Sequence, residues 1–205
     1  MKIGIITALL CILYLISAVY CNAGTDQSIK DNSTPIEGTL PDGGNVSVFD
    51  GSRTKTVNLP PGKFKVQHSV TEGLYGVVFI TKDGFVPETL IFKSGKATLE
   101  PDVISMRKLN DVKKGVITGV VYKQVRGGKL RRHNGIGRFF KDERITLSGL
   151  AGTYTVVSDD KGVFMMELPP GEYDIIFSGK KTGRAVIAPG GTVIKNILKG
   201  MVLVD

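Results

Sequence analysis

The sequence predicts an all-β protein built from two small β-sandwiches in tandem, and two observations support this prediction. The first is a repeated motif, because residues 59–66 (LPPGKFKV) and residues 168–175 (LPPGEYDI) share a Leu-Pro-Pro-Gly corner followed by the same alternation of residue types. A Pro-Pro-Gly corner is incompatible with the interior of a helix or of a central strand, and the alternation after it places every second side chain on one face of a strand. The second is a series of short β-rich runs separated by turn residues, which is typical of sandwiches.

The first sandwich is expected over residues 35–110. No segment in this part shows a convincing helical period, and turn residues separate the β-rich runs. Function is therefore expected on the loops and surfaces of a sandwich rather than in a deep active site. The strands predicted here are residues 46–49, 56–59, 76–81, 89–92 and 103–106, with a further strand after the first Pro-Pro-Gly corner.

The second sandwich is expected over residues 111–205. Seven short β-rich runs over about ninety residues match the strand count of a sandwich. The polar bridge 108–114 is the predicted boundary, and because it is short we expect the two domains to touch. The predicted strands are residues 115–122, 145–147, 154–157, 163–166, 173–177, 192–194 and 201–203.

Three segments of the second half resemble the carboxypeptidase regulatory-like domain, a transthyretin-like β-sandwich. Residues 116–121 (VITGVV) look like its opening strand, residues 158–164 (SDDKGVF) like its acidic hairpin and residues 168–173 (LPPGEY) like its proline corner. The resemblance is clearest over residues 115–205 and implies a non-catalytic module. Residues 35–110 resemble the same domain less well, as a degenerate copy, and an immunoglobulin-like topology is the alternative there.

The first 23 residues have the layout of a secretory signal peptide. A single cation, Lys2, precedes the apolar run 3–19, and small residues stand at 23–24. We therefore predict export to the periplasm, the cell surface or the medium. Membrane attachment is expected only if this leader stays uncleaved as an anchor or if Cys21 is lipidated.

Groups for metal or nucleophile chemistry are scarce in this chain. Both cysteines, Cys11 and Cys21, lie in the predicted leader, so cleavage would leave no thiol for a disulfide, a zinc site or catalysis. His68 and His133 lie in polar and basic stretches and are expected to be exposed. The carboxylates at 159–160 fall short of the about six to eight oxygen ligands that calcium prefers, and we expect them to form a hairpin turn. No cofactor, metal site or enzymatic activity is predicted, and residues 24–34 are expected to be a flexible tether.

Positive charge is concentrated between residues 123 and 144. The segment contains eight basic residues and only two acidic ones, Asp142 and Glu143, so it carries 8 − 2 = +6 of the +8 net charge of the chain. Its glycines predict a long flexible loop between the first two strands of the second sandwich, and such loops often bind partners. We predict that this loop docks an anionic partner, the alternative being a solvated loop that only aids solubility. The candidate residues are Lys123, Arg126, Lys129, Arg131, Arg132, Arg138, Lys141 and Arg144.

These observations together predict an exported, non-enzymatic binding or structural module of the cell envelope or surface. The expected partner is an envelope or extracellular protein or an anionic glycan, and no nucleic acid is expected because an exported protein seldom meets it. A small transthyretin-like hydrolase is one alternative, disfavoured by the shortage of histidines, and a carbohydrate-binding module is another, disfavoured by the absence of Trp. Residues 200–205 are also a candidate edge for pairing with a partner strand.

Overall fold

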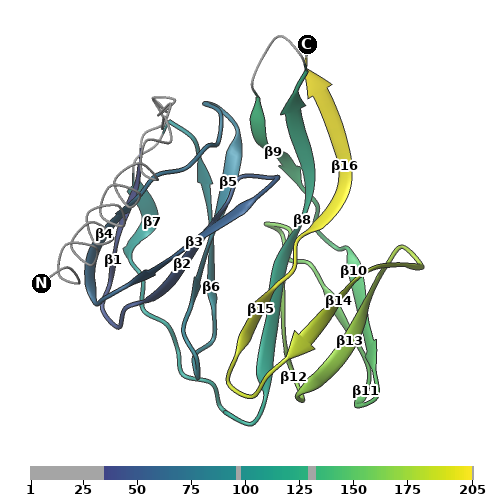
Figure 1. Ribbon diagram of the computed structural model, residues 1–205. Coiled ribbons are helices and arrows are strands. Elements are labelled where there is room, and N and C mark those ends of the chain that lie inside the picture. Colours follow the sequence, from purple (N-terminus) through teal and green to yellow (C-terminus); the bar gives the residue numbers. More distant parts are fainter. Residues whose placement is uncertain (1–34, 96–97, 129–132, 205) are drawn as a thin grey trace, which may run out of the picture. The chain divides into compact units, whose positions relative to one another are not determined.

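The computed structural model describes residues 35–95, 98–128 and 133–204, and all regular elements in these ranges are β-strands (Figure 1). The predicted signal peptide and tether, residues 1–34 with both cysteines, lie outside the described residues. Across the part of the chain that is described, there is no helix of the length and hydropathy that a membrane span requires.

The first sandwich packs a three-stranded sheet against a larger one. The three-stranded sheet has the order β4-β1-β7, and the facing strands run β3-β2-β5-β6. Buried Ile36 and Phe64 from the first sheet meet Val48 and Ile80 from the second in one apolar core. The strands are β1 (Ile36–Leu40), β2 (Gly44–Phe49), β3 (Thr54–Leu59), β4 (Gly62–Val66), β5 (Tyr75–Thr81), β6 (Glu88–Lys93) and β7 (Thr98–Val103).

The second sandwich is built in the same way from the remaining strands. A four-stranded sheet, β11-β10-β13-β14, faces β12, β8 and β15, and Leu147 and Ile175 from one side pack with Ile117 and Phe164 from the other. The prediction of an all-β protein with two tandem small sandwiches is confirmed. The strands are β8 (Gly115–Gly127), β9 (Asn134–Phe139), β10 (Arg144–Gly149), β11 (Gly152–Val157), β12 (Val163–Leu168), β13 (Gly171–Phe177), β14 (Lys180–Ile187), β15 (Thr192–Ile194) and β16 (Ile197–Val204).

Both Pro-Pro-Gly corners carry the chain from one sheet of a sandwich to the other. β3 pairs with β2 before the first corner, and β4 pairs with β1 after it. Likewise β12 pairs with β8 and β13 pairs with β10. The predicted alternation after each corner is confirmed, because Phe64 and Val66 are buried in β4, and Tyr173 and Ile175 are buried in β13. The Tyr173 hydroxyl also donates to the Pro169 carbonyl at 2.9 Å, which holds the second corner.

Strand β8 is buried on both faces over its first eight residues. Ile117 and Val121 point into the core of the second sandwich. Val120 and Tyr122, on the opposite face, pack in a separate cluster with Phe79 of β5. Continuous apolar runs are expected in strands covered on both faces, and the runs in β5 and β8 fit that rule. Strands from both halves of the chain consequently share one sheet, in which β9 joins β8 to β5.

The expectation of a long flexible loop over residues 123–144 is wrong. Residues 123–127 continue β8, and residues 134–139 form β9, which pairs with β8 in antiparallel fashion. The glycines serve close packing here, because a Cβ on Gly135 would come within 2.6 Å of the Leu74 side chain, and one on Gly51 within 2.8 Å of the Gly135 carbonyl oxygen. The basic segment is therefore largely a β-hairpin whose strands are held against the first sandwich.

Candidate functional site

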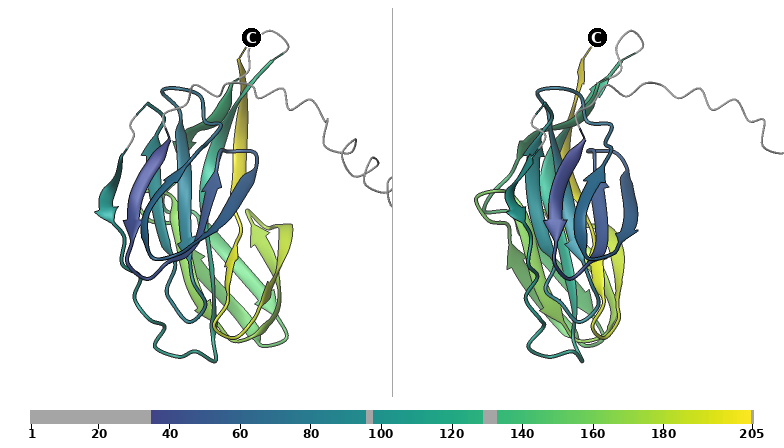
Figure 2. Two further views of the ribbon diagram at one scale, coloured as in Figure 1. Left: turned by 60° about the vertical axis from the view of Figure 1, so that its left-hand side comes forward. Right: turned by 90° about the vertical axis from the view of Figure 1, so that its left-hand side faces the viewer.

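The second half of β8 has different neighbours from the first half and is the central strand of the β9-β8-β16 part of the large sheet. β12 pairs with β8 as far as Val120, and β15 as far as Thr118. Beyond these residues β9 lies antiparallel on one side of β8 and β16 lies parallel on the other. Figure 1 shows β16 running beside the far end of β8, and Figure 2 shows the same pair, in yellow and teal, from two further directions.

One face of this sheet gathers cations, and we call it the basic face, defined by Lys123, Arg138 and Lys199. Lys123 of β8 stands directly opposite Arg138 of β9. Lys199 lies at the irregularity between Leu198 and Gly200 in β16. The Arg138 guanidinium is 5.2 Å from the centre of the Phe140 ring and the Lys199 ammonium is 4.7 Å from it, so two cations contact one aromatic ring.

The cations of the basic face are only partly neutralised. Lys199 forms an ion pair with Glu143, whose side chain is 20% exposed. Among the described residues, neither Lys123 nor Arg138 has a carboxylate within ion-pairing distance. Like charges directly opposite one another on a sheet are unfavourable, so this pair would gain from a bound anion.

The structure separates the other predicted site residues from this pair. Arg126 is exposed on β8, but the alternation of the strand puts it on the opposite face from Lys123. Lys141 is exposed and lies 3.8 Å from both the Asp142 and the Asp160 carboxylates. Arg144 begins β10 in the four-stranded sheet. Lys129, Arg131 and Arg132 lie outside the described residues.

Sequence reasoning missed Lys199. Its partner Glu143 is 56 residues away, and β16 pairs with β8 in parallel, so no local pattern brings the two segments together. The apolar and basic composition of residues 197–204 was the available signal, but it indicated a strand and not the neighbour of that strand.

A polar network fastens the start of this sheet to the first sandwich. The Tyr122 hydroxyl donates to the Gly51 carbonyl at 3.1 Å, and burial raises the pKa of Tyr122 to about 12, with a further contribution from the charge of Asp50. Burial raises the pKa of Asp50, but hydrogen bonds from the Ser69 hydroxyl and from main-chain N–H groups, including that of Arg53, outweigh it, so the pKa is below the usual value. The ionised Asp50 thus stabilises the turn that supports β8.

The histidines do not form a metal site with other ligands in the described ranges. No group of three or more His, Cys, Asp or Glu side chains gathers there. The expectation that His68 is exposed is wrong, because it is 5% exposed, its Nδ1 accepts a hydrogen bond from the Val70 N–H at 3.2 Å, and its ring packs on Phe92. The sequence signal for this inward position was the alternation of apolar Phe64, Val66 and Val70 with polar residues, which places His68 in the apolar series.

Residues 158–164 form the predicted turn, but the expectation of a hairpin is wrong, because the strands on either side of the turn belong to different sheets. The Asp159 Oδ1 accepts hydrogen bonds from the N–H groups of Lys161 at 2.9 Å and Val163 at 2.8 Å. Gly162 adopts a φ of 74°, which glycine accommodates without strain. This carboxylate therefore shapes the turn that carries the chain from β11, which pairs with β10, to β12, which pairs with β8 in the facing sheet.

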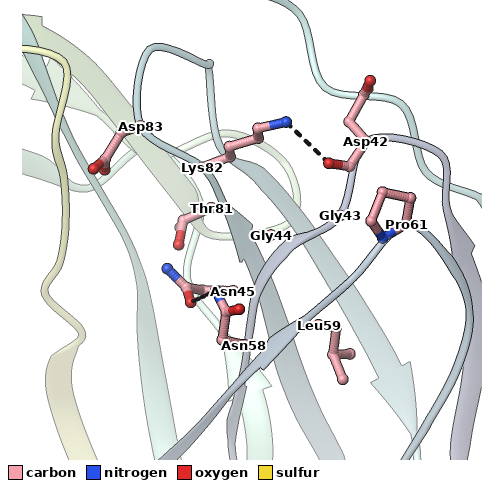
Figure 3. A pocket seen from close by; sticks show the side chains of 10 residues that line it. All are labelled: Asp42, Gly43, Gly44, Asn45, Asn58, Leu59, Pro61, Thr81, Lys82 and Asp83. Atoms are coloured by element: carbon pink, nitrogen blue, oxygen red, sulfur yellow. Dashed lines mark hydrogen bonds between the residues drawn. The ribbon is translucent and has the colours of Figure 1, made fainter.

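A hollow of about 360 Å³ lies on the first sandwich (Figure 3). Its polar groups bind one another, because the Asn58 amide donates to the Asn45 side-chain oxygen at 2.8 Å and the Lys82 ammonium donates to the Asp42 carbonyl at 2.9 Å. No aromatic side chain is among the residues that line it. Sugar sites usually offer an aromatic face for stacking, so this hollow lacks the expected feature of a carbohydrate-binding module.

Comparison with known proteins gives weak likenesses to solved structures only. The sequence matches no protein-family model, and the search of curated proteins finds no similar sequence. Among solved structures, the TIE protein of Bacillus anthracis is similar at 13% identity and a TM-score of 0.27 over 83% of this chain and 34% of that protein, so this chain spans about a third of its length. GBS52, the minor pilin of Streptococcus agalactiae, is 10% identical with a TM-score of 0.30, over 81% of this chain and 86% of that one. A fimbrial protein of Bacteroides ovatus is 8% identical with a TM-score of 0.29, over 84% and 50% of the two chains.

Proposed function

We propose that the protein is an exported, non-enzymatic module of the cell envelope or surface that docks an anionic partner through the basic face. The observation that carries this proposal is the pairing of Lys123 with Arg138, directly opposite each other and with no carboxylate partner among the described residues. A bound carboxylate, sulfate or phosphate would relieve their repulsion and accept charge-assisted hydrogen bonds from both.

The setting of these cations favours binding over simple solvation. Lys123 is half-buried in a strand rather than extended from a mobile loop, so less side-chain freedom is lost when it contacts a ligand. Arg138 and Lys199 are positioned against the Phe140 ring, which limits their motion in the same way. A rigid sheet that presents preset cations is a better anion site than a flexible chain of the same charge.

The remaining parts of the proposal rest on sequence and fold together. Export follows from the leader predicted over residues 1–23, and the second sandwich is proposed to be of the carboxypeptidase regulatory-like kind. A non-catalytic role is part of the same proposal and follows from the resemblance to a non-catalytic module.

The test is salt-dependent retention of the mature protein on an anionic glycan resin. The key variant, called the hairpin variant, neutralises the basic face, with Lys123→Gln and Arg138→Gln in the hairpin and Lys199→Gln in β16 beside it. A matched control removes the same charge elsewhere, with Lys55→Gln, Lys63→Gln and Lys161→Gln, all at exposed positions. We expect the hairpin variant to elute at distinctly lower salt than the control variant, because focused charge binds a polyanion more strongly than dispersed charge. Equal elution of the two variants would contradict the proposal.

A further inference from the structure

Strand β16 is an open sheet edge. Its ladder is made with β8, and no main-chain hydrogen bond joins it to another strand within the described ranges. The Val204 carbonyl accepts from the Gly128 N–H at 2.8 Å and therefore points toward β8. Because the main-chain groups of successive residues in a strand point to opposite sides, the N–H and C=O groups of Met201 and Leu203 point outward. The edge thus offers unpaired donors and acceptors to an added strand.

The face of β16 opposite the basic face is apolar and exposed. Met201 and Leu203 lie in register with Gln124 and Arg126, on the other side of the sheet from Lys123. The side chains of Leu198, Met201 and Leu203 are 46%, 45% and 68% exposed. An added strand would cover these side chains with every second residue of its own.

The charges decide which strand fits this edge. A second copy of β16 would bring two basic faces side by side, and their repulsion would oppose pairing. An acidic strand would instead place its carboxylates on the basic face. Lys199 of β16 would then be on the neighbouring strand, and Lys123 and Arg138 would lie on the two strands beyond it. Adjacent strands are about 4.8 Å apart, so extended glutamate and lysine side chains can meet across this distance.

We infer that β16 accepts an extended acidic segment of another protein as an added strand, with alternating apolar residues facing Leu198, Met201 and Leu203 and acidic residues facing the basic face. This inference rests on the proposed function, because it names the partner of the same face. Main-chain hydrogen bonds supply the affinity of such an added strand, and alternate side chains supply the specificity.

The experiment compares two fluorescent peptides of equal composition, one alternating Glu and Val and one with Glu and Val in separate blocks, by fluorescence anisotropy with the mature full chain. We expect the alternating peptide to bind at least about tenfold more tightly. The variant Leu203→Pro removes an outward N–H and leaves the bonds to β8 intact, so it should lose that advantage. Leu203→Ala keeps the N–H and serves as the matched control, and circular dichroism checks that both variants fold.

A second readout is independent of any variant. Amide hydrogen exchange at Met201 and Leu203 should slow when the alternating peptide binds, because the outward N–H groups become hydrogen-bonded. If both peptides bind equally and these amides stay unprotected while retention on the anionic resin persists, the strand inference is overturned and the proposed anion site stands. If retention on the resin also fails, the proposed function falls as well. Sedimentation that shows a β16-dependent homodimer would overturn the inference in favour of a second copy.

Discussion

The two strands β14 and β16 are both edges of the second half, yet their surfaces differ sharply. Lys181 of β14 pairs with Asp174 at 2.8 Å, and Arg184 contacts Glu172 at 3.2 Å and Asp174 at 3.5 Å. β16 carries one charged residue, Lys199, and exposes a row of large apolar side chains. Both strands are anchored in the same apolar core.

This difference shows which edge is protected against pairing. Charged side chains on an edge strand discourage the approach of another strand, since their burial would cost solvation energy. The ion pairs of β14 satisfy that rule, whereas β16 has the composition expected of an edge that meets a partner. Stability alone does not explain this composition, because exposed apolar side chains add little to the folded state.

The largest expected effect is on stability, and it distinguishes the buried start of β16 from the exposed part of that strand. Ile197 is 4% exposed in the core and Met201 is 45% exposed. Ile197→Ala should lower the free energy of unfolding by about 2–4 kcal/mol through lost burial and a residual cavity. Met201→Ala should cost less than about 1 kcal/mol. Urea unfolding of the two variants measures both values, and equal losses would mean that the outer part of β16 is also core.

A second prediction exchanges the character of the two edges. Replacing the β14 cations, with Lys181→Val and Arg184→Val, should change stability by less than about 1 kcal/mol, because exposed ion pairs contribute little. The same change should promote self-association, since it leaves β14 apolar and unprotected. Light scattering against protein concentration measures this association. Met201→Glu with Leu203→Glu in β16 is the reciprocal variant. It should weaken binding of the alternating peptide without loss of folding, because it removes the apolar contacts and repels the glutamates of the peptide.

The sequence was sufficient for the parts of the fold that local chemistry determines. The Pro-Pro-Gly corners and their alternating strands, β4 and β13, follow from the steric limits of Pro and the period of a strand. One boundary was predicted wrongly. A strand was predicted at 103–106, but β7 spans Thr98–Val103, and its pairing with β1 ends at Val103.

Long-range pairing accounts for most of what was missed. β9 contains glycines that are poor strand formers, and it becomes a strand through its fit against Leu74 and Gly51. β14 was not predicted because its first residues, KKTGR, are polar; it forms a strand through its antiparallel pairing with β13. The concentration of cations was visible in the sequence, but the meeting of Lys123, Arg138 and Lys199 depends on the parallel pairing of β16 with β8. The ligand of the basic face stays a proposal.

A third prediction concerns the cation that links β16 to the basic face. Lys199→Met removes the partner of Glu143 and one of the two cations at the Phe140 ring. Stability should fall by on the order of 1 kcal/mol, since the pair is partly exposed. Retention on the anionic resin should weaken more than in Lys180→Met, a control on the other edge, because Lys180 is exposed at the start of β14. Equal retention of the two variants would remove Lys199 from the anion site.

The smallest predicted effect tests the protection of β14 by its charges. The hydrogen bond from Lys181 is the main cause that lowers the pKa of Asp174. Desolvation opposes it, and the charges of Lys181 and Arg184 add to the lowering, so the pKa lies below its usual value. A carboxyl with a lowered pKa in the folded state stabilises the fold above its unfolded pKa of about 3.9, and this contribution is lost as the pH falls through the folded pKa. Titration of Asp174 by NMR should give a midpoint below that of an unfolded peptide, and Lys181→Met should raise it. If the midpoint does not move, the Lys181 contact is not formed in solution, and the contrast between the two edges would rest on composition alone.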